Sequence, residues 1–296
     1  MSKQQKWGQL HKEIPGIYYE LVIDNTPVRP VQARTLQKLF AWVVIFLVFM
    51  LGWQDGTSRA IEVLLGISPM PEYRSTLSLS SFLQSLLQAV IICATAIVAM
   101  LAFQSSARPV RPHRTGKSFL LAFAAATVAA VLGFQLADLL SGALGQVRNS
   151  YPVPPVSNDD LPTLFYALDS ALAGPTEELA LTALLVLALR ATGHSWVWVY
   201  VAAILFRLPF HLYYGWGAFG LMIWPVLIVA VYRRTGMIMP IILAHSAFNM
   251  SGFVPLAKDV LEVACTLLIG VIAMRRLIES PGAISLRRSP KQDSAQ

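Results

Sequence analysis

The sequence has few charged residues for its length. Only 13% of its 296 residues are Asp, Glu, Lys or Arg, whereas 55% are hydrophobic; a soluble domain carries about 25% charged residues. This shortage of charge excludes an ordinary soluble globular domain. Several apolar runs reach the roughly 18–20 residues needed to cross a bilayer. The sequence therefore predicts an all-α fold, a polytopic transmembrane helical bundle of about eight spans in a lipid bilayer.

Cysteines and targeting signals are scarce as well. The two cysteines, Cys93 and Cys265, lie inside apolar runs, and we expect buried small side chains rather than a disulfide or a metal site. The first residues, MSKQQKWGQLHKEIPG, lack an apolar segment, so no cleavable signal peptide is predicted. The net charge of +7 comes from Lys and Arg between apolar runs, which is typical of cytoplasmic loops and not of a nucleic-acid-binding surface.

The apolar runs predict the organisation of the chain. Residues 1–35 form a polar cytoplasmic tail, 36–160 the N-terminal transmembrane helices, 161–275 a second group of transmembrane helices, and 276–296 a basic cytoplasmic tail. No internal repeat is visible, so an inverted-repeat transporter is not indicated. The predicted spans, separated early on by a mixed segment at 54–79, are 36–53, 80–104, 118–143, 164–190, 196–214, 218–232, 236–253 and 257–274.

The distribution of basic residues predicts the orientation. With a cytoplasmic N-terminus, every strongly basic segment falls on the cytoplasmic side, and the loop 146–162, with Asp159 and Asp160, falls outside. Both termini are then cytoplasmic. The basic segments are 29–38, 108–117, Arg190, 233–234 and 275–288.

Ionisable side chains inside the predicted spans are the first candidates for a functional site. Each costs about 2.5–3.5 kcal/mol at a helix centre on insertion scales, so such residues are rarely retained without a role. They are Asp138, Asp169, Glu177, Glu178, Arg207, His211 and His245, with Asn249 as a neutral polar companion.

Glu177 and Glu178 are adjacent in the segment GPTEELALTAL, residues 174–184. A helix start with Gly174 as N-cap and Pro175 in the first turn would by itself favour acidic residues there. However, a helix from 175 to 190 would be only about 24 Å long, so residues 164–173 must complete the span. The Gly-Pro break then lies near mid-membrane, where polar groups must line protein or a water-filled cavity. This favours a functional role for the pair.

Arg207 and His211 are four residues apart and share one helix face. Pro209 between them leaves the carbonyl of Leu205 without its usual partner and favours a kink. The alternative is a snorkelling Arg207 and a structural His211 near the interface, beside the neighbouring pair of tyrosines at 213 and 214.

His245 and Asn249 repeat the four-residue spacing on a later span. Depth along the helices tests whether the candidates can meet. At 1.5 Å per residue, the glutamate pair lies roughly 18–20 Å from the basic end of its span, His211 roughly 24 Å and His245 roughly 16 Å. Helix tilts near 20° and the two proline kinks can absorb this spread, so these depths allow one shared cluster. For Asp138 and Asp169 we expect pairing with Arg207 or capping of a break, and no catalytic role.

Three motifs in this order resemble the CPBP family, the CAAX protease and bacteriocin-processing proteins that are also called Abi or Rce1-like intramembrane proteases. The family's Glu-Glu-x-x-x-Arg motif is similar to EELALT at 177–182, its Phe-x-x-x-His motif to RLPFH at 207–211, and its His-x-x-x-Asn/Asp motif to HSAFN at 245–249. The resemblance covers about 165–275 and implies that 161–275 is the catalytic core. Residues 1–160 match only in being membrane spans.

Two positions depart from the family pattern. Thr182 stands where the family has Arg, and Arg207 stands where it has Phe. The resemblance implies that the family's Arg holds the glutamate pair by a salt bridge. We therefore hypothesise that Arg207 supplies the missing guanidinium from the neighbouring helix.

The resemblance implies a glutamate-dependent endopeptidase that acts inside the membrane. A desolvated Glu177 or Glu178 would be the general base towards a water that His211 orients, and His245 and Asn249 would donate to the oxyanion. No cofactor is expected in this mechanism. The family also brings zinc into consideration, with Glu178, His211 and His245 as the three-ligand set, although no HExxH is present.

Other functions remain open at this stage. The chain lacks the Gly-x-Ser-Gly of a rhomboid-type protease and the Gly-x-Gly-Asp of an aspartyl type, despite YALD at 166–169. A proton- or cation-coupled transporter, or a non-catalytic scaffold or immunity protein of the same fold, would also use buried ionisable groups. The expected partner is a membrane-associated peptide or protein: a prenylated protein, a bacteriocin leader or a membrane anchor protein. The Ala-rich composition, with more Arg than Lys, hints at a bacterial plasma membrane.

Overall fold

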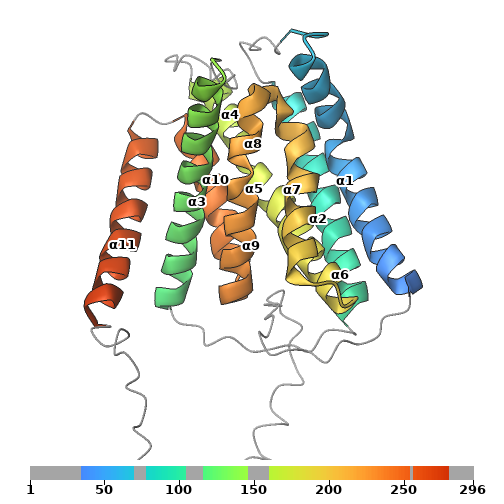
Figure 1. The fold of residues 1–296 in the computed structure, drawn as a ribbon. Coiled ribbons are helices and arrows are strands. Elements are labelled where there is room, and N and C mark those ends of the chain that lie inside the picture. The colour runs from blue at the N-terminus through green and yellow to red at the C-terminus, as the bar shows by residue number, and fades with distance from the viewer. Residues whose placement is uncertain (1–34, 70–77, 105–115, 146–159, 254–255, 280–296) are drawn as a thin grey trace, which may run out of the picture.

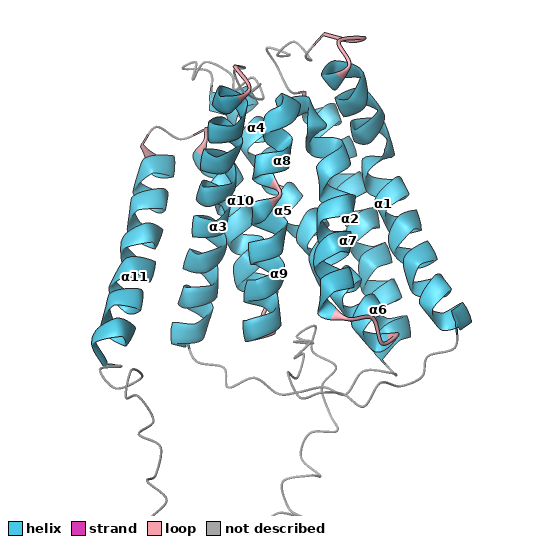
Figure 2. Cartoon of the chain, viewed as in Figure 1, coloured by secondary structure: helices cyan, strands magenta, loops and turns pink. Residues whose placement is uncertain are grey.

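The computed structural model describes residues 35–69, 78–104, 116–145, 160–253 and 256–279. Within these ranges every regular element is a helix, and Figure 2 shows no strand among them, so the predicted all-α bundle is confirmed. The elements are α1 (Thr35–Leu64), α2 (Leu79–Gln104), α3 (Gly116–Ala143), α4 (Asp160–Ala171), α5 (Ala173–Glu177), η1 (Glu178–Leu184), α6 (Leu185–Ala191), α7 (Trp196–His211), η2 (Leu212–Gly217), α8 (Ala218–Leu221), α9 (Ile223–Thr235), α10 (Met239–Ser251) and α11 (Ala257–Glu279).

Within the described ranges, five helical segments are long and apolar enough to cross a membrane by length and composition. They are Thr35–Leu64, Leu79–Phe103, Gly116–Ala143, Leu164–Ala191 and Trp196–Leu221. The last three predicted runs, at 218–232, 236–253 and 257–274, also contain helices: α9, α10 and α11. Each of the eight predicted runs therefore corresponds to helical structure. The 13-residue helices α9 and α10 are each about 20 Å long, shorter than a bilayer core.

The first helix is longer than the sequence analysis predicted. We expected the span to end near residue 53 and a mixed segment to follow, but α1 continues to Leu64. Residues 54–64 contain no proline, and Ala60 in this part is buried. Helix α1 packs on η2 and α7, and a Cβ on Gly56 in this stretch would lie 3.9 Å from the Cβ of Phe210 on α7, so tertiary contact supports the longer helix.

The third helix packs through small side chains. One face of α3 is buried and consists mainly of alanine, including Ala126, Ala130 and Ala137, and it contacts α8, α9, α10 and α11 (Figure 1). A Cβ added to Gly220 of α8 would lie only 2.5 Å from the carbonyl oxygen of Leu136. Small residues let helix backbones approach closely where lipid supplies no hydrophobic driving force between helices.

The span Leu164–Ala191 runs through the centre of the bundle. It comprises α4, α5, η1 and α6 (yellow-green to yellow in Figure 1). In the 18-residue apolar stretch of this span, 78% of the residues are buried. The corresponding share in the other four candidate spans is 22–39%. This span carries the two adjacent glutamates, so the fold brings them into the protein interior and away from lipid.

Basic residues lie at the same end of several helices. Lys38 near the start of α1, Arg190 at the end of α6, and Arg233 and Arg234 at the end of α9 all belong to helix ends on the same side (Figure 1). Arg59 late in α1 and Lys258 early in α11 lie elsewhere, and the orientation of the termini stays a prediction. The tails 1–34 and 280–296, and most residues of the segments 29–38, 108–117, 146–162 and 275–288, lie outside the described residues.

Both cysteines are free. Cys265 is buried, as predicted, whereas Cys93 on α2 is only half-buried. The prediction of a buried side chain was therefore right for Cys265 and only partly right for Cys93.

Candidate active site

The predicted break in the central span is small and lies at Leu172, between α4 and α5. Pro175 has no N–H to donate to the carbonyl of Ala171, one turn earlier. The hydroxyl of Ser246 on α10 donates to this carbonyl instead, at 2.8 Å. A side chain from a neighbouring helix thus satisfies the carbonyl that the proline leaves free, and the chain continues as helix.

Gly174 does not cap a helix, which corrects the sequence analysis. The residue before α5 is Leu172, and Gly174 lies inside α5. A Cβ on Gly174 would lie 2.7 Å from the carbonyl oxygen of Ile242 and would also clash with Ser246. Glycine is required here because α5 and α10 approach closely, not because a helix starts.

The two glutamates lie at a change of helix type. Glu177 ends α5, and Glu178 begins η1, a seven-residue π-helix. π-helical segments are rare and occur frequently at functional sites. Within η1 the hydroxyl of Thr182 donates to Oε2 of Glu178 at 2.7 Å.

Arg207 on α7 contacts both glutamates. Its Nη1 donates to Oε2 of Glu177 at 3.3 Å, and its Nη2 donates to Oε2 of Glu178 at 2.8 Å. The same Nη2 donates to the hydroxyl of Thr182 at 2.9 Å. Thr182 stands where the family has Arg, and Arg207 stands where it has Phe. The guanidinium of Arg207 therefore donates to both Glu178 and Thr182. This is the arrangement that the compensation hypothesis requires.

The environment of Arg207 is fully protein-lined. The side chain is 0% exposed, and its Nε is buried without a hydrogen-bond partner. The guanidinium carbon lies 4.7 Å from the centroid of the Trp224 ring, a cation–π contact. This contradicts a snorkelling arginine at the interface.

His245 on α10 completes the contacts of Glu178. Its Nδ1 lies 2.9 Å from Oε1 of Glu178, and because a carboxylate only accepts, Nδ1 must carry the proton. Both oxygens of Glu178 are therefore occupied, Oε1 by His245 and Oε2 by Arg207 and Thr182. Glu178 is 0% exposed.

Glu177 differs from Glu178 in two ways. Its side chain keeps 9% of its surface exposed, against 0% for Glu178. Its contact with Arg207, at 3.3 Å, is longer and involves only Oε2. Of the two adjacent carboxylates, Glu177 is the one with an oxygen still able to accept a proton from a bound water.

His211 lies at the end of α7, and its Nδ1 is 2.8 Å from the carbonyl oxygen of Arg207. A carbonyl accepts, so Nδ1 carries the proton, and Nε2 is left with its lone pair. The rings of Tyr213 and Tyr214 lie 6.3 and 6.1 Å from the His211 ring. These tyrosines contact the candidate site and are not only an interfacial belt.

Trp224 on α9 is a member of the cluster that the sequence analysis missed. Its ring meets the His245 ring edge-on at 4.6 Å and the His211 ring at 6.2 Å, and it lies under Arg207. The side chain is 6% exposed. Nothing in its local sequence distinguishes it from a lipid-facing tryptophan; only the packing of α9 against α7 does.

Asn249 lies beside the cluster rather than in it. Its Nδ2 donates to the carbonyl of Ser170 at the end of α4, at 3.2 Å. Together with Ser246 it supports the carbonyls next to the break. Among the described residues, no hydrogen bond joins Asn249 to the glutamates or histidines, and its bond to the Ser170 carbonyl favours a positioning role.

Asp138 and Asp169 do not pair with Arg207, which corrects that part of the prediction. The two terminal nitrogens of Arg207 donate to Glu177, Glu178 and Thr182 instead. Asp138 is exposed on α3, and Asp169 lies against Ser85 of α2.

The residues do not fit the zinc set Glu178, His211 and His245. In the part of the chain that the structure describes, no three His, Cys, Asp or Glu side chains are arranged to hold a metal ion. Both oxygens of Glu178 already accept hydrogen bonds, Oε1 from His245 and Oε2 from Arg207 and Thr182, so neither oxygen is free for a metal ion. No step through a metal is therefore derived.

Comparison with known proteins identifies the segment that holds this cluster. Residues 159–251 match the family model described as "Rce1-like: Type II CAAX prenyl endopeptidase Rce1-like". The match contains Glu177, Glu178, Arg207, His211 and His245, and it confirms the family resemblance found in the sequence. No curated protein and no solved structure matches the chain.

Proposed function

We propose that this chain, which carries a domain of the Rce1-like CAAX protease family, is an intramembrane endopeptidase with Glu177 as its general base. The observation that carries the assignment is the asymmetry of the glutamate pair. Both oxygens of Glu178 accept hydrogen bonds from other side chains, whereas within the described part of the chain only Oε2 of Glu177 does, and the Glu177 side chain keeps 9% of its surface exposed.

In the proposed reaction Glu177 removes a proton from water as the water oxygen attacks the peptide carbonyl carbon. His211 accepts a hydrogen bond from the same water through Nε2 and so orients it. When the tetrahedral intermediate collapses, the C–N bond breaks, and the proton on Glu177 passes to the leaving nitrogen. The carboxylate of Glu177 is thereby regenerated.

His245 is the proposed donor to the oxyanion. With Nδ1–H given to Glu178, Nε2 can donate only when the ring is protonated. Glu177, Glu178 and Arg207 carry a combined formal charge of −1, so a protonated His245 brings the buried cluster to zero. Neutral clusters are far cheaper to bury than charged ones. Asn249 would support this arrangement by holding α4 against α10.

The test uses the full chain in liposomes with membrane-anchored reporter peptides, farnesylated, acylated or transmembrane, and detects new peptide termini by mass spectrometry. Glu177→Gln is expected to lower the cleavage rate by about 10²–10⁴-fold, the usual contribution of a general base. Glu62→Gln is the matched control, because Glu62 is exposed on α1. Cleavage by Glu177→Gln at the wild-type rate would refute the assignment of the base.

Two further outcomes separate the alternatives. Cleavage that survives exhaustive dialysis against EDTA supports the metal-free mechanism, whereas cleavage lost on dialysis and restored by zinc contradicts it. A pH-gradient-driven ion flux without cleavage of any anchored peptide would favour a transporter.

A further inference from the structure

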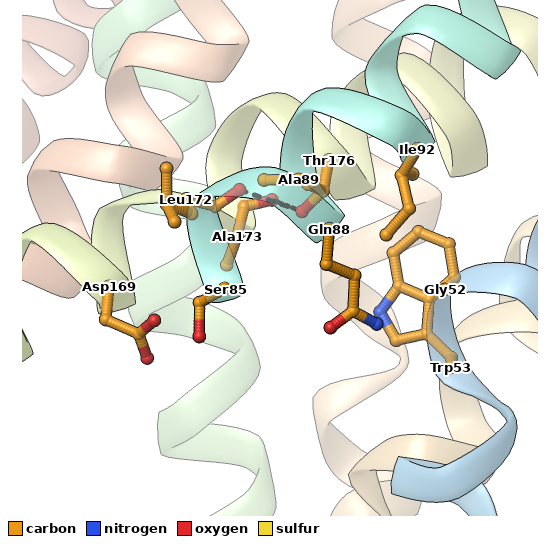
Figure 3. Close-up of a pocket in the computed structure, with 10 residues that line it drawn as sticks. All are labelled: Gly52, Trp53, Ser85, Gln88, Ala89, Ile92, Asp169, Leu172, Ala173 and Thr176. Carbon is orange, nitrogen blue, oxygen red and sulfur yellow. Dashed lines mark hydrogen bonds between the residues drawn. The ribbon is translucent and has the colours of Figure 1, made fainter. Parts of the chain in front are cut away.

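A polar pocket of about 170 Å³ lies next to the proposed catalytic segment, between α1, α2, α4 and α5. Ala89, Ile92 and Thr176 are buried and form its deep end, whereas Gln88 is exposed. Figure 3 shows side chains from α1, α2 and the central span around it. The pocket therefore leads from the outside of the bundle towards Thr176, the residue before Glu177.

One carboxylate determines the charge of this pocket. Of the ten residues that line it, all in the described part of the chain, Asp169 alone has an ionisable side chain. The hydroxyl of Ser85 lies beside it and interacts with it. No Lys, Arg or His lines the pocket. A carboxylate inside a span without a cation beside it is costly, and such groups usually have a functional partner.

Of the polar side chains that line the pocket, Thr176 is already hydrogen-bonded within the central span, and those of Asp169, Ser85 and Gln88 are available to a ligand. The hydroxyl of Thr176 is already donated to the carbonyls of Leu172 and Ala173, at 2.8 and 3.2 Å (dashed lines in Figure 3). The side-chain ends of Asp169, Ser85 and Gln88 point to the same side in Figure 3. They offer a carboxylate, a hydroxyl and an amide to one polar group.

We infer that this pocket is a substrate subsite that binds a lysine or arginine side chain of the peptide to be cleaved. The inference rests on the proposed endopeptidase function. The ammonium or guanidinium would pair with Asp169 and donate hydrogen bonds to the side-chain oxygens of Ser85 and Gln88. The apolar stem would lie along Leu172 and Ile92, as long basic side chains do on apolar surfaces, with the Trp53 ring available for a cation–π contact.

The dimensions agree with a residue close to the scissile bond. Asp169 and Thr176 are seven residues apart on the central span, about 10 Å along a helix, and Glu177 follows Thr176. A basic side chain held by Asp169 therefore belongs to a substrate residue near the bond that Glu177 attacks. The pocket combines residues of α1 and α2, which lie outside the segment that matches the family, with Asp169 and Thr176, which lie within it.

The experiment compares anchored peptides that differ at one position, which is moved stepwise along both sides of the cleavage site. Each carries lysine, arginine, glutamate or norleucine, the uncharged analogue of the lysine stem. The wild type is expected to cleave the lysine or arginine peptide with a kcat/KM about tenfold or more above the norleucine peptide at one position. Asp169→Asn should remove this ratio, and Asp169→Lys should invert it in favour of glutamate. Asp138→Asn, an exposed aspartate on α3, is the matched control and should keep the wild-type ratio.

A binding measurement separates the subsite from the protease function. Anisotropy of a fluorescent peptide is recorded with Glu177→Gln protein, with and without Asp169→Asn. Lysine-dependent binding without any cleavage by the wild type would support the pocket as a binding site for a basic side chain and refute the proposed protease function. Cleavage without preference for a basic residue would refute the pocket and sustain the protease. A preference unchanged by Asp169→Asn, or sodium-dependent flux that Asp169→Asn abolishes, would also overturn the inference.

Discussion

Two spans of this protein show opposite relations between hydropathy and burial. The span Leu79–Phe103, in α2, has a mean hydropathy of 2.5, and only 28% of its most apolar window is buried. The central span Leu164–Ala191 has a lower mean hydropathy of 1.5, yet 78% of its window is buried. The less apolar segment is the one inside the bundle.

This order follows from the solvent. In a bilayer, lipid tails accept apolar side chains as readily as a protein core does, so the most apolar helices gain little by being buried. Ionisable groups have no such partner in lipid and must find one within the protein. The central span carries Glu177 and Glu178, and neighbouring helices supply Arg207 and His245. These polar contacts favour the burial of the central span.

The strongest way to disturb this comparison is to remove the arginine. Arg207→Phe leaves two buried adjacent carboxylates without their cation. We expect a loss of about 3–5 kcal/mol in the free energy of unfolding, as for other broken buried ion pairs, and loss of cleavage. Thermal unfolding in detergent and the anchored-peptide assay measure the two effects.

A second substitution tests whether position matters or only charge. In the double variant Thr182→Arg/Arg207→Phe, the guanidinium returns to the position at which the family carries it. Partial recovery of stability and cleavage is expected. If Arg207→Phe alone is as stable and active as the wild type, the compensation hypothesis is wrong.

The next effect concerns apolar packing in the two spans. Leu185 on α6 is 0% exposed, whereas Leu101 on α2 is 51% exposed. Leu185→Ala should cost about 2–5 kcal/mol because it opens a cavity. Leu101→Ala should stay within about 0.5 kcal/mol. Equal losses in chemical or thermal unfolding would mean that α2 is buried by a partner in the membrane.

A smaller effect is expected where the central span touches α10. Gly174→Ala forces a methyl group towards the Ile242 carbonyl, 2.7 Å from the Cβ position, and should cost about 1–3 kcal/mol. Gly270→Ala on α11 is the control, because a Cβ there meets nothing within 4 Å. A Gly174→Ala variant with the stability of Gly270→Ala would show that α5 can move away from α10 without cost.

The smallest effect lies outside the spans, at His194 between α6 and α7. The indole N–H of Trp42 donates to Nε2 of His194 at 3.0 Å, and burial, with a smaller contribution from Lys38, lowers the pKa of His194. In the unfolded chain the His194 ring takes up a proton near pH 6.5, whereas the folded protein favours the neutral ring. The contribution of this ring to the free energy of unfolding is therefore complete above that pH and falls as the pH drops below it.

Removing the Trp42 donor changes this pH dependence. Trp42→Phe should cost about 0.5–1.5 kcal/mol near pH 7.5, the value of one hydrogen bond. It should also make the decline between pH 7.5 and 5.5 shallower, because protonated His194 no longer faces an N–H group. Unfolding midpoints at each pH provide the measurement. A steeper decline in the variant would contradict the assignment of the neutral ring.

Local patterns predicted much of the fold and of the candidate site. Apolar runs indicated the helices, and buried charge pointed to Glu177, Glu178, Arg207, His211 and His245. Sequence did not indicate the π-helix, because ELALTAL at 178–184 consists of ordinary helix formers apart from Thr182. It also missed Trp224, whose role depends on which helix it faces.

The sequence by itself determined which ionisable residues lie inside apolar helices, where an isolated charge is costly and polar partners within the protein are favoured. Only the tertiary structure decided how they meet. It directs Arg207 to both glutamates, assigns His245 to Glu178, and leaves Asn249 with the Ser170 carbonyl. Hydrogen bonds act over about 3 Å, a precision that helix spacing and depth along a span do not reach.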